Sequence, residues 1–260
     1  MTRTAETAVG PMLRDWRQRR RLSQLELASR AEVSPRHVSR VEGGLVSPTS
    51  GMILRLSDHL RVPLREQNRL LLAGGYAPAH PDLALDSPPM VEVHHALTDI
   101  LTAHLPWPAL VVDRHWELVD ANDAIYALLD GVDADLLEPP VNVVRLSVDP
   151  RGLAPRILNL DEWRGALAHR LAQEYDLTAD PELAVLIADL RASGPCPAPA
   201  GSALVVPFRV RAGEGILSFL STTTVFGTAR EVTLSELAIE AFYPADAATR
   251  AALAGPASPV

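Results

Sequence analysis

The residues best suited to specific chemistry in this sequence are polar side chains in the segment 34–43. Arg36 and Arg40 are four residues apart, so on a helix they would lie one turn apart on the same face. His37 and Ser39 flank them. An arginine guanidinium can donate two parallel hydrogen bonds to the N7 and O6 atoms of guanine. This spacing makes the two arginines candidate hydrogen-bond donors to one acceptor surface.

Most other reactive chemistry lacks its residues. All 24 basic residues are arginine, which excludes a phosphate-binding loop with its lysine, a Schiff-base lysine and a Ser-Lys dyad. A single cysteine, Cys196, excludes an internal disulfide and a multi-cysteine zinc site. His94 and His95 are adjacent, so on a helix they diverge by about 100° and cannot chelate one ion together. No His-Glu-x-x-His or Gly-x-Ser-x-Gly motif occurs. We therefore expect no enzyme, no metal site and no cofactor.

Charge divides the chain into two parts. Residues 1–73 hold 13 arginines and 7 acidic residues, whereas residues 74–260 hold 11 arginines and 25 acidic residues. A basic segment joined to an acidic one is typical of a nucleic-acid module attached to a second domain. No apolar run approaches the roughly 20 residues that span a bilayer, and residues 2–10 lack the layout of a signal peptide. We expect a cytoplasmic protein without a membrane partner.

The basic segment predicts five short helices. Ser23 with Glu26 three residues later forms a capping box, and Ser34 followed by Pro35 is a second helix start. Gly43-Gly44 ends that helix. The predicted helices cover about 9–20, 23–31, 34–43, 49–60 and 63–73.

These residues carry a resemblance. "LRDWRQRRRLSQLELASRAEVSPRHVSRVEGGLVSPTSGMILRLSDHL" resembles the five-helix helix-turn-helix domain of the phage-repressor and Cro class, the XRE family. The matching features are Gln24 opening the second helix, Ala28 within it, the capping Ser34 and the Glu42-Gly43-Gly44 close.

The resemblance implies that helix 34–43 enters the major groove of double-stranded DNA. It also implies that Gln24 bridges to a phosphate or to the third helix. We expect the cluster of Arg17, Arg19, Arg20 and Arg21 to meet phosphates or solvent. The DNA-binding residues that follow from this resemblance are Ser23, Gln24, Ser34, Arg36, His37, Ser39 and Arg40.

The acidic part begins with a linker. Proline and turn residues over 74–90 predict a break between a DNA-binding domain at 1–73 and a second domain at 91–260. That second domain reads as a helix over 91–105, two strands near 109–112 and 117–121, and a helix after Asn122. Helices near 161–174 and 181–192 follow, and then strands over 203–211, 215–225 and 234–243. The order predicts an α+β fold, with an antiparallel five-stranded sheet carrying helices on one face.

Two stretches of this second domain resemble the ligand-binding domain of MmyB-like (MltR-type) regulators, whose fold is of the PAS kind. They are "WPALVVDRHWELVDANDAIYALL" and "STTTVFGTAREVTLSELAIEAFYPADAAT". The segment between these two stretches departs from the family pattern. The Arg-Asn stretch usual in the family appears here only as Val141-Asn142-Val143-Val144-Arg145. The resemblance implies a sensor for a small apolar ligand such as a fatty acid. The residues that would contact this ligand are Trp107, Trp116, Asn122, Ile125, Leu128, Phe219, Phe226 and Phe242.

The sequence favours the first of three functions that we compare. The first is a ligand-responsive DNA-binding transcription regulator. The second is a DNA-binding regulator whose C-terminal domain serves only dimerisation or protein contact, and the third is an enzyme with an attached DNA-binding domain. One helix-turn-helix reads only a few base pairs, so we expect a homodimer on a palindromic operator. Arg209 and Arg211 flank a predicted hairpin turn and are expected to be solvated.

Overall fold

A computed structural model describes residues 9–198 and 205–254 of the 260-residue chain. The chain divides into two compact units. Unit 1 holds the residues up to Leu83 together with Asp176–Thr178 and Thr228–Ser235, and unit 2 holds the rest. Within the described ranges, no helix combines the length and the apolar character needed to cross a membrane.

Unit 1 contains the five helices predicted from the sequence. Ser23, Ser34 and Thr49 each cap a helix by accepting a hydrogen bond from a backbone N–H three residues later. At Ser23 the box is complete, because the Glu26 carboxylate also accepts from the Ser23 backbone N–H at 2.7 Å. The helices are α1 (Val9–Arg19), α2 (Gln24–Arg30), α3 (Pro35–Glu42), α4 (Ser50–His59) and α5 (Leu64–Ala73).

The core of unit 1 forms from one apolar residue or more on each helix. Leu13, Leu27, Val38, Ile53 and Leu70 are all almost fully buried. Helix α1 lies so close to α3 that a Cβ on Gly10 would fall 2.3 Å from the Val41 carbonyl oxygen. Only glycine fits there, and its presence fixes the distance between these two helices.

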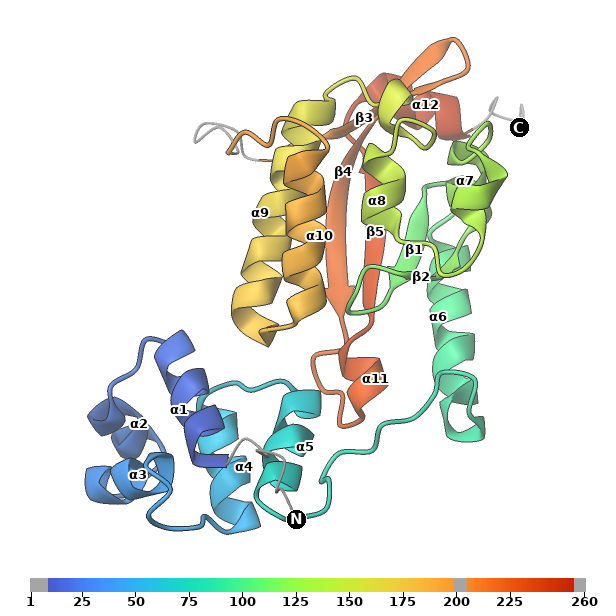
Figure 1. The fold of residues 1–260 in the computed structure, drawn as a ribbon. Helices are drawn as coiled ribbons and strands as arrows, with labels where there is room; N and C mark the ends of the chain where they lie inside the picture. Colours follow the sequence, from blue (N-terminus) through green and yellow to red (C-terminus); the bar gives the residue numbers. More distant parts are fainter. Residues whose placement is uncertain (1–8, 199–204, 255–260) are drawn as a thin grey trace. The chain divides into compact units, whose positions relative to one another are not determined.

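Unit 2 is built around one antiparallel sheet of five strands (Figure 1). The strands lie in the order β2-β1-β5-β4-β3. Strands β1 and β5, the first and last in the sequence, therefore pair with each other in the interior of the sheet. Strands β3 and β4 form a hairpin with Ala212 opposite Gly215, as the sequence predicts. The strands are β1 (Ala109–Val112), β2 (Leu118–Ala121), β3 (Phe208–Ala212), β4 (Gly215–Val225) and β5 (Ala238–Pro244).

Helices pack over the sheet of unit 2. Figure 1 shows α9 and α10 side by side, with α8 and α7 further along the same layer. Leu110 and Val112 of β1 pack with Ile125 of α7, and all four residues of β1 are buried, so both faces of this strand are covered. Helix α6 also contacts β1. The longer helices are α6 (Val91–Ala103), α9 (Leu160–Thr178), α10 (Pro181–Ala192) and α12 (Ala247–Ala254), and the shorter ones are α7 (Asp123–Leu128), α8 (Val143–Val148) and α11 (Val232–Ser235).

The fold confirms the predicted α+β class and corrects several bounds. The last strand begins at Ala238 and not at residue 234, because Val232–Ser235 forms the short helix α11. Strand β3 begins at Phe208, and the first two residues of its predicted range lie outside the described residues. Helices α8 and α12 were not predicted.

Candidate functional site

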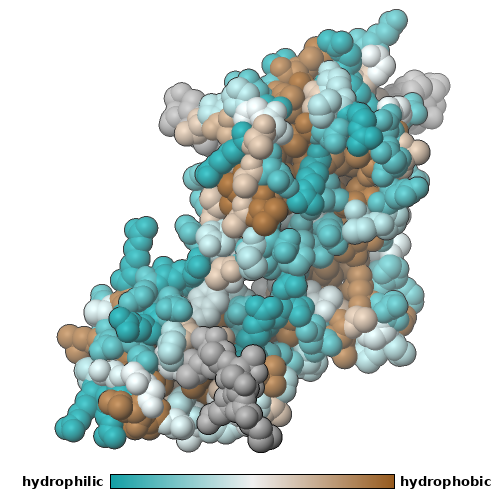
Figure 2. Space-filling view, viewed as in Figure 1, coloured by the Kyte–Doolittle hydropathy of each residue, from teal (hydrophilic) through white to brown (hydrophobic). Residues whose placement is uncertain are grey.

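Helix α3 presents a polar face to solvent. Arg36, Ser39 and Arg40 are exposed and His37 is half-buried, whereas Val38 and Val41 are 1 % exposed. Over the described residues, neither Arg36 nor Arg40 forms an ion pair, so both guanidinium groups can reach an external acceptor. Figure 2 shows hydrophilic side chains with smaller hydrophobic patches on the end of unit 1 that carries α2 and α3.

A buried carboxylate holds α3 against its neighbours. Glu42 accepts hydrogen bonds from Arg17 Nε at 2.6 Å and from Arg17 Nη2 at 2.8 Å. It also accepts from Gln24 Nε2 at 2.9 Å. These bonds to Glu42 raise the pKa of Arg17 above its ordinary value. One carboxylate thus joins α1, α2 and α3 and fixes the direction in which α3 projects.

This arrangement corrects part of the sequence interpretation. Arg17 is buried and paired, and so it is neither a phosphate contact nor a solvated surface charge. Arg20 donates to the carbonyl oxygens of Leu60 and Arg61. Gln24 bridges to the third helix, which was one of its two predicted partners.

The two capping serines keep access to solvent. Ser23 and Ser34 are exposed, and their hydroxyl oxygens accept the capping bonds of α2 and α3.

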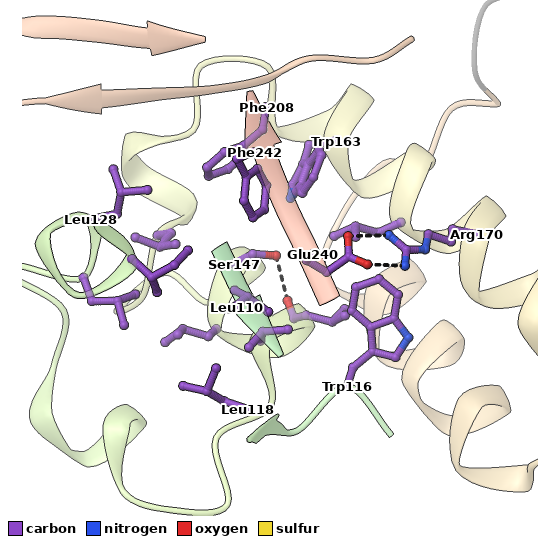
Figure 3. Close-up of a pocket in the computed structure, with 17 residues that line it drawn as sticks. Leu110, Trp116, Leu118, Leu128, Ser147, Trp163, Arg170, Phe208, Glu240 and Phe242 are labelled. Atoms are coloured by element: carbon purple, nitrogen blue, oxygen red, sulfur yellow. Dashed lines mark hydrogen bonds and ion pairs between the residues drawn. The ribbon is translucent and has the colours of Figure 1, made fainter. Parts of the chain in front are cut away.

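Unit 2 contains an apolar cavity of about 90 Å³ between the sheet and helices α7, α8 and α9 (Figure 3). Phe208, Phe242 and Trp163 lie together along one part of its wall, and Leu128 lies across from them (Figure 3). The lining is almost entirely aliphatic and aromatic. It consists of Leu110, Trp116, Leu118, Ile125, Leu128, Leu129, Val143, Val144, Leu146, Ser147, Leu153, Trp163, Leu167, Arg170, Phe208, Glu240 and Phe242.

Trp116 enters the cavity wall from a strained turn. Its φ of 63° lies in the left-handed region, which costs a bulky residue roughly 1–3 kcal/mol. Asp113 supports the turn by accepting hydrogen bonds from the backbone N–H groups of His115 and Glu117. The indole Nε1 donates to Glu174 at 2.8 Å, and the Arg170 guanidinium lies 4.4 Å from the ring centroid. The turn thus positions the ring against a cation.

An ion pair closes the cavity wall beside Trp116. Arg170 donates from Nη1 and Nη2 to the two oxygens of Glu240, at 2.7 and 2.5 Å, and from Nε to Glu174 at 3.2 Å. Burial lowers the pKa of Arg170, but the hydrogen bonds and charge of Glu240 outweigh burial and hold that pKa above its ordinary value. Arg170 therefore stays charged at neutral pH beside Glu240, which is 4 % exposed.

The cavity brings together four of the eight residues proposed for ligand contact. They are Trp116, Ile125, Leu128 and Phe242. Phe219 is buried in the adjoining core against Phe208, and Phe226 does not line the cavity. Trp107 packs against His104 and Tyr243 instead.

Asn122 serves the fold. Its side chain accepts from the Ala109 and Ile125 backbone N–H groups and donates to the Leu101 and Trp107 carbonyl oxygens. Arg209 and Arg211 are exposed, as expected from the sequence.

Sequence reasoning missed the polar part of the lining. Trp163, Leu167, Arg170 and Glu174 recur at helical spacing and so share one face of α9. An arginine within an apolar stripe is the signal that could have identified Arg170. Its partner Glu240 lies 70 residues further along the chain and had no local signal.

Known protein families match both parts of the chain. Residues 93–255 match the MmyB-like transcription regulator ligand binding domain, and residues 8–70 match a helix-turn-helix domain. A comparison with curated proteins finds no match. The first match contains the whole lining of the cavity, and the second contains α1 to α4 and most of α5.

Proposed function

The chain belongs to the family of MmyB-like transcription regulators, and from that premise we propose that an apolar, fatty-acid-like ligand in the cavity of unit 2 controls how tightly α3 binds DNA. The protein is a DNA-binding transcription regulator with a ligand-binding domain. The identity of the ligand and its effect on DNA are the proposed parts.

The observation that carries the ligand proposal is the apolar lining of the cavity. A cavity lined by aliphatic and aromatic side chains with few polar groups favours an apolar molecule over a polar one. Its volume of about 90 Å³ is small beside the usual several hundred of a ligand pocket. We propose that a chain-like ligand enters by displacing leucine side chains of the wall.

On the DNA side, we propose that Arg36 and Arg40 read base edges, with His37 and Ser39 beside them. Ser23, Gln24 and Ser34 would help to position the protein on the phosphate backbone. Support comes from the exposure of both arginines and from the Glu42 contacts that fix α3. Residues 1–73 form the DNA-binding domain in this proposal, 74–90 the linker and 91–260 the sensor.

We also propose a homodimer on a palindromic operator, since one recognition helix reads too few base pairs to specify a site. Val91 and Ile100 of α6 are 43 % and 42 % exposed, which favours residues 91–260 as the contacting part. A domain that only dimerises is the alternative to the sensor.

Two measurements test the proposal. Wild-type protein is used to select sites from random DNA, and a variant carrying both Arg36→Ala and Arg40→Ala is expected to lose the selected consensus while keeping its fold. Native mass spectrometry of the purified protein, followed by organic extraction, is expected to reveal a bound apolar molecule. A consensus unchanged in the double variant contradicts the DNA assignment. The ligand assignment fails if no apolar compound binds, whether co-purified or added.

A further inference from the structure

The cavity wall contains one hydrogen-bond donor without an acceptor. Trp163 Nε1 is buried and, within the described part of the chain, has no hydrogen-bond partner. Figure 3 shows the Trp163 ring beside Phe242 on the cavity lining. A buried N–H group is nearly always paired in folded proteins, so an orphan on a cavity wall indicates an acceptor that arrives with a ligand.

The other polar groups of the lining do not supply that acceptor. The Glu240 carboxylate is engaged at both oxygens by Arg170, and Ser147 Oγ donates to the Val144 carbonyl oxygen at 2.8 Å. The remainder of the lining is aliphatic or aromatic. Among the described residues, no group of the lining supplies this acceptor, which leaves a ligand to supply it.

The charges beside the cavity decide which acceptor fits. Arg170 is paired with Glu240 and Glu174, so the formal charges of this cluster of three groups sum to −1. All three guanidinium nitrogens already have a carboxylate partner, and Trp116 covers one face of the group. A ligand carboxylate would meet a neutralised arginine and an extra negative charge in an apolar setting, which is unfavourable.

We infer that the ligand is an uncharged molecule with a hydrocarbon body and one accepting oxygen, such as an ester, lactone or ketone, and that this oxygen accepts from Trp163 Nε1. This inference rests on the proposed function. It narrows a fatty-acid-like ligand to one whose head group is neutral.

The test uses indole N–H signals from full-length protein labelled with ¹⁵N-tryptophan. The chain has four tryptophans, so four signals are expected, and Trp163→Phe identifies one of them by its loss. Methyl octanoate and sodium octanoate are titrated separately at neutral pH. The ester is expected to move the Trp163 proton downfield as the new hydrogen bond forms, and to bind at least roughly tenfold more tightly than the carboxylate.

Variants separate recognition from general packing. Trp163→Phe is expected to weaken the ester by roughly five- to tenfold, the worth of one neutral hydrogen bond, and to leave binding of n-octane unchanged. Trp107→Phe is the matched control, because Trp107 does not line the cavity, and it should bind all three compounds as wild type. Glu240→Gln is expected to reduce the preference for the ester, since it frees Arg170 to meet a carboxylate.

Three results would overturn the inference. The first is octanoate binding as tightly as its methyl ester, and the second is an ester that binds without moving the Trp163 signal. Either of these two results contradicts the neutral head group of the ligand but leaves the proposal of a sensor for apolar ligands standing. The third is that none of the three compounds binds and no apolar molecule co-purifies, in which case the proposed function fails as well.

Discussion

Glu42→Ala is expected to destabilise the helix-turn-helix unit by about 3 kcal/mol. The carboxylate accepts three hydrogen bonds, and its side chain is 4 % exposed against 10 % for Arg17. Removing one member of a buried ion pair costs about 3–5 kcal/mol, because the other charge is left without its partner. Arg17 keeps its hydrogen bond to the Leu22 carbonyl oxygen at 2.7 Å, which places the loss at the lower end.

Hydrogen–deuterium exchange of the full-length protein measures this loss where it occurs. A decrease of about 3 kcal/mol corresponds to a roughly 150-fold loss of protection for the most protected amides of residues 9–42. Peptides from residues 160–192 belong largely to the other unit and should exchange as in wild type. The combined variant Arg17→Met and Glu42→Leu should recover most of the protection, since apolar residues of similar size often replace a buried pair at little cost.

Arg69→Ala is the control for a pair that should not matter, because Arg69 is 57 % exposed and its pair with Glu66 is worth at most about 1 kcal/mol. Protection in Glu42→Ala within about threefold of wild type would refute the assigned role of the buried carboxylate.

Three further predictions concern DNA contact, pH and assembly. Arg36→Ala and Arg40→Ala should each weaken binding to the preferred operator by about 1–3 kcal/mol and relax the preference at one base position. Arg191→Ala removes an exposed arginine of unit 2 and should bind DNA as wild type does. If footprinting finds the same binding for all three variants, the assignment of the α3 face to the DNA groove is wrong. The backbone N–H of Ser23 donates to the Glu26 carboxylate and holds the pKa of Glu26 below its ordinary value. The stability that this bond contributes is therefore fully present above the pKa that Glu26 has in the unfolded chain. It is lost as the pH falls through the lower pKa that Glu26 has in the folded protein. The free energy of unfolding of Glu26→Gln should fall less steeply with decreasing pH than that of wild type. An equally steep fall in the variant would argue against the capping box. Light scattering should find that the 91–260 fragment is a dimer at tens of micromolar. A monomeric fragment would contradict a dimer contact within residues 91–260, and dimerisation would then depend on DNA or on unit 1.

Local signals account for what the sequence predicted well. Helices α2, α3 and α4 begin directly after Ser23, Ser34 and Thr49, because a side-chain cap depends only on residues three positions away. The β3–β4 hairpin likewise followed from its short turn. The start of β5 was wrong because the apolar residues before it suit both a strand and the helical turn α11, and local pattern does not separate the two.

Long-range pairing accounts for what was missed. In the sequence, Arg17 is one of a run of arginines typical of a surface, and its partner Glu42 lies 25 residues away. The Arg170–Glu240 pair spans 70 residues, and nothing near either residue in sequence indicates it. The family resemblance alone indicates Trp116, Ile125, Leu128 and Phe242, which line the cavity. Trp163 and its unpaired nitrogen depend on packing between α9 and the sheet.

The most direct test of ligand control is a fluorescence-anisotropy titration of operator DNA with and without an apolar ligand. A ligand can change operator affinity only through its different affinities for two states of the protein, and such coupling is usually about 1–3 kcal/mol. We predict a roughly 5–150-fold change for wild type with methyl octanoate or a longer fatty-acid-like chain. Leu128 is 8 % exposed on the cavity wall, so Leu128→Trp should fill the space and abolish the response while leaving ligand-free DNA binding near wild type. An operator affinity that stays constant in wild type across neutral and acidic apolar compounds would contradict the account and favour a domain that only dimerises.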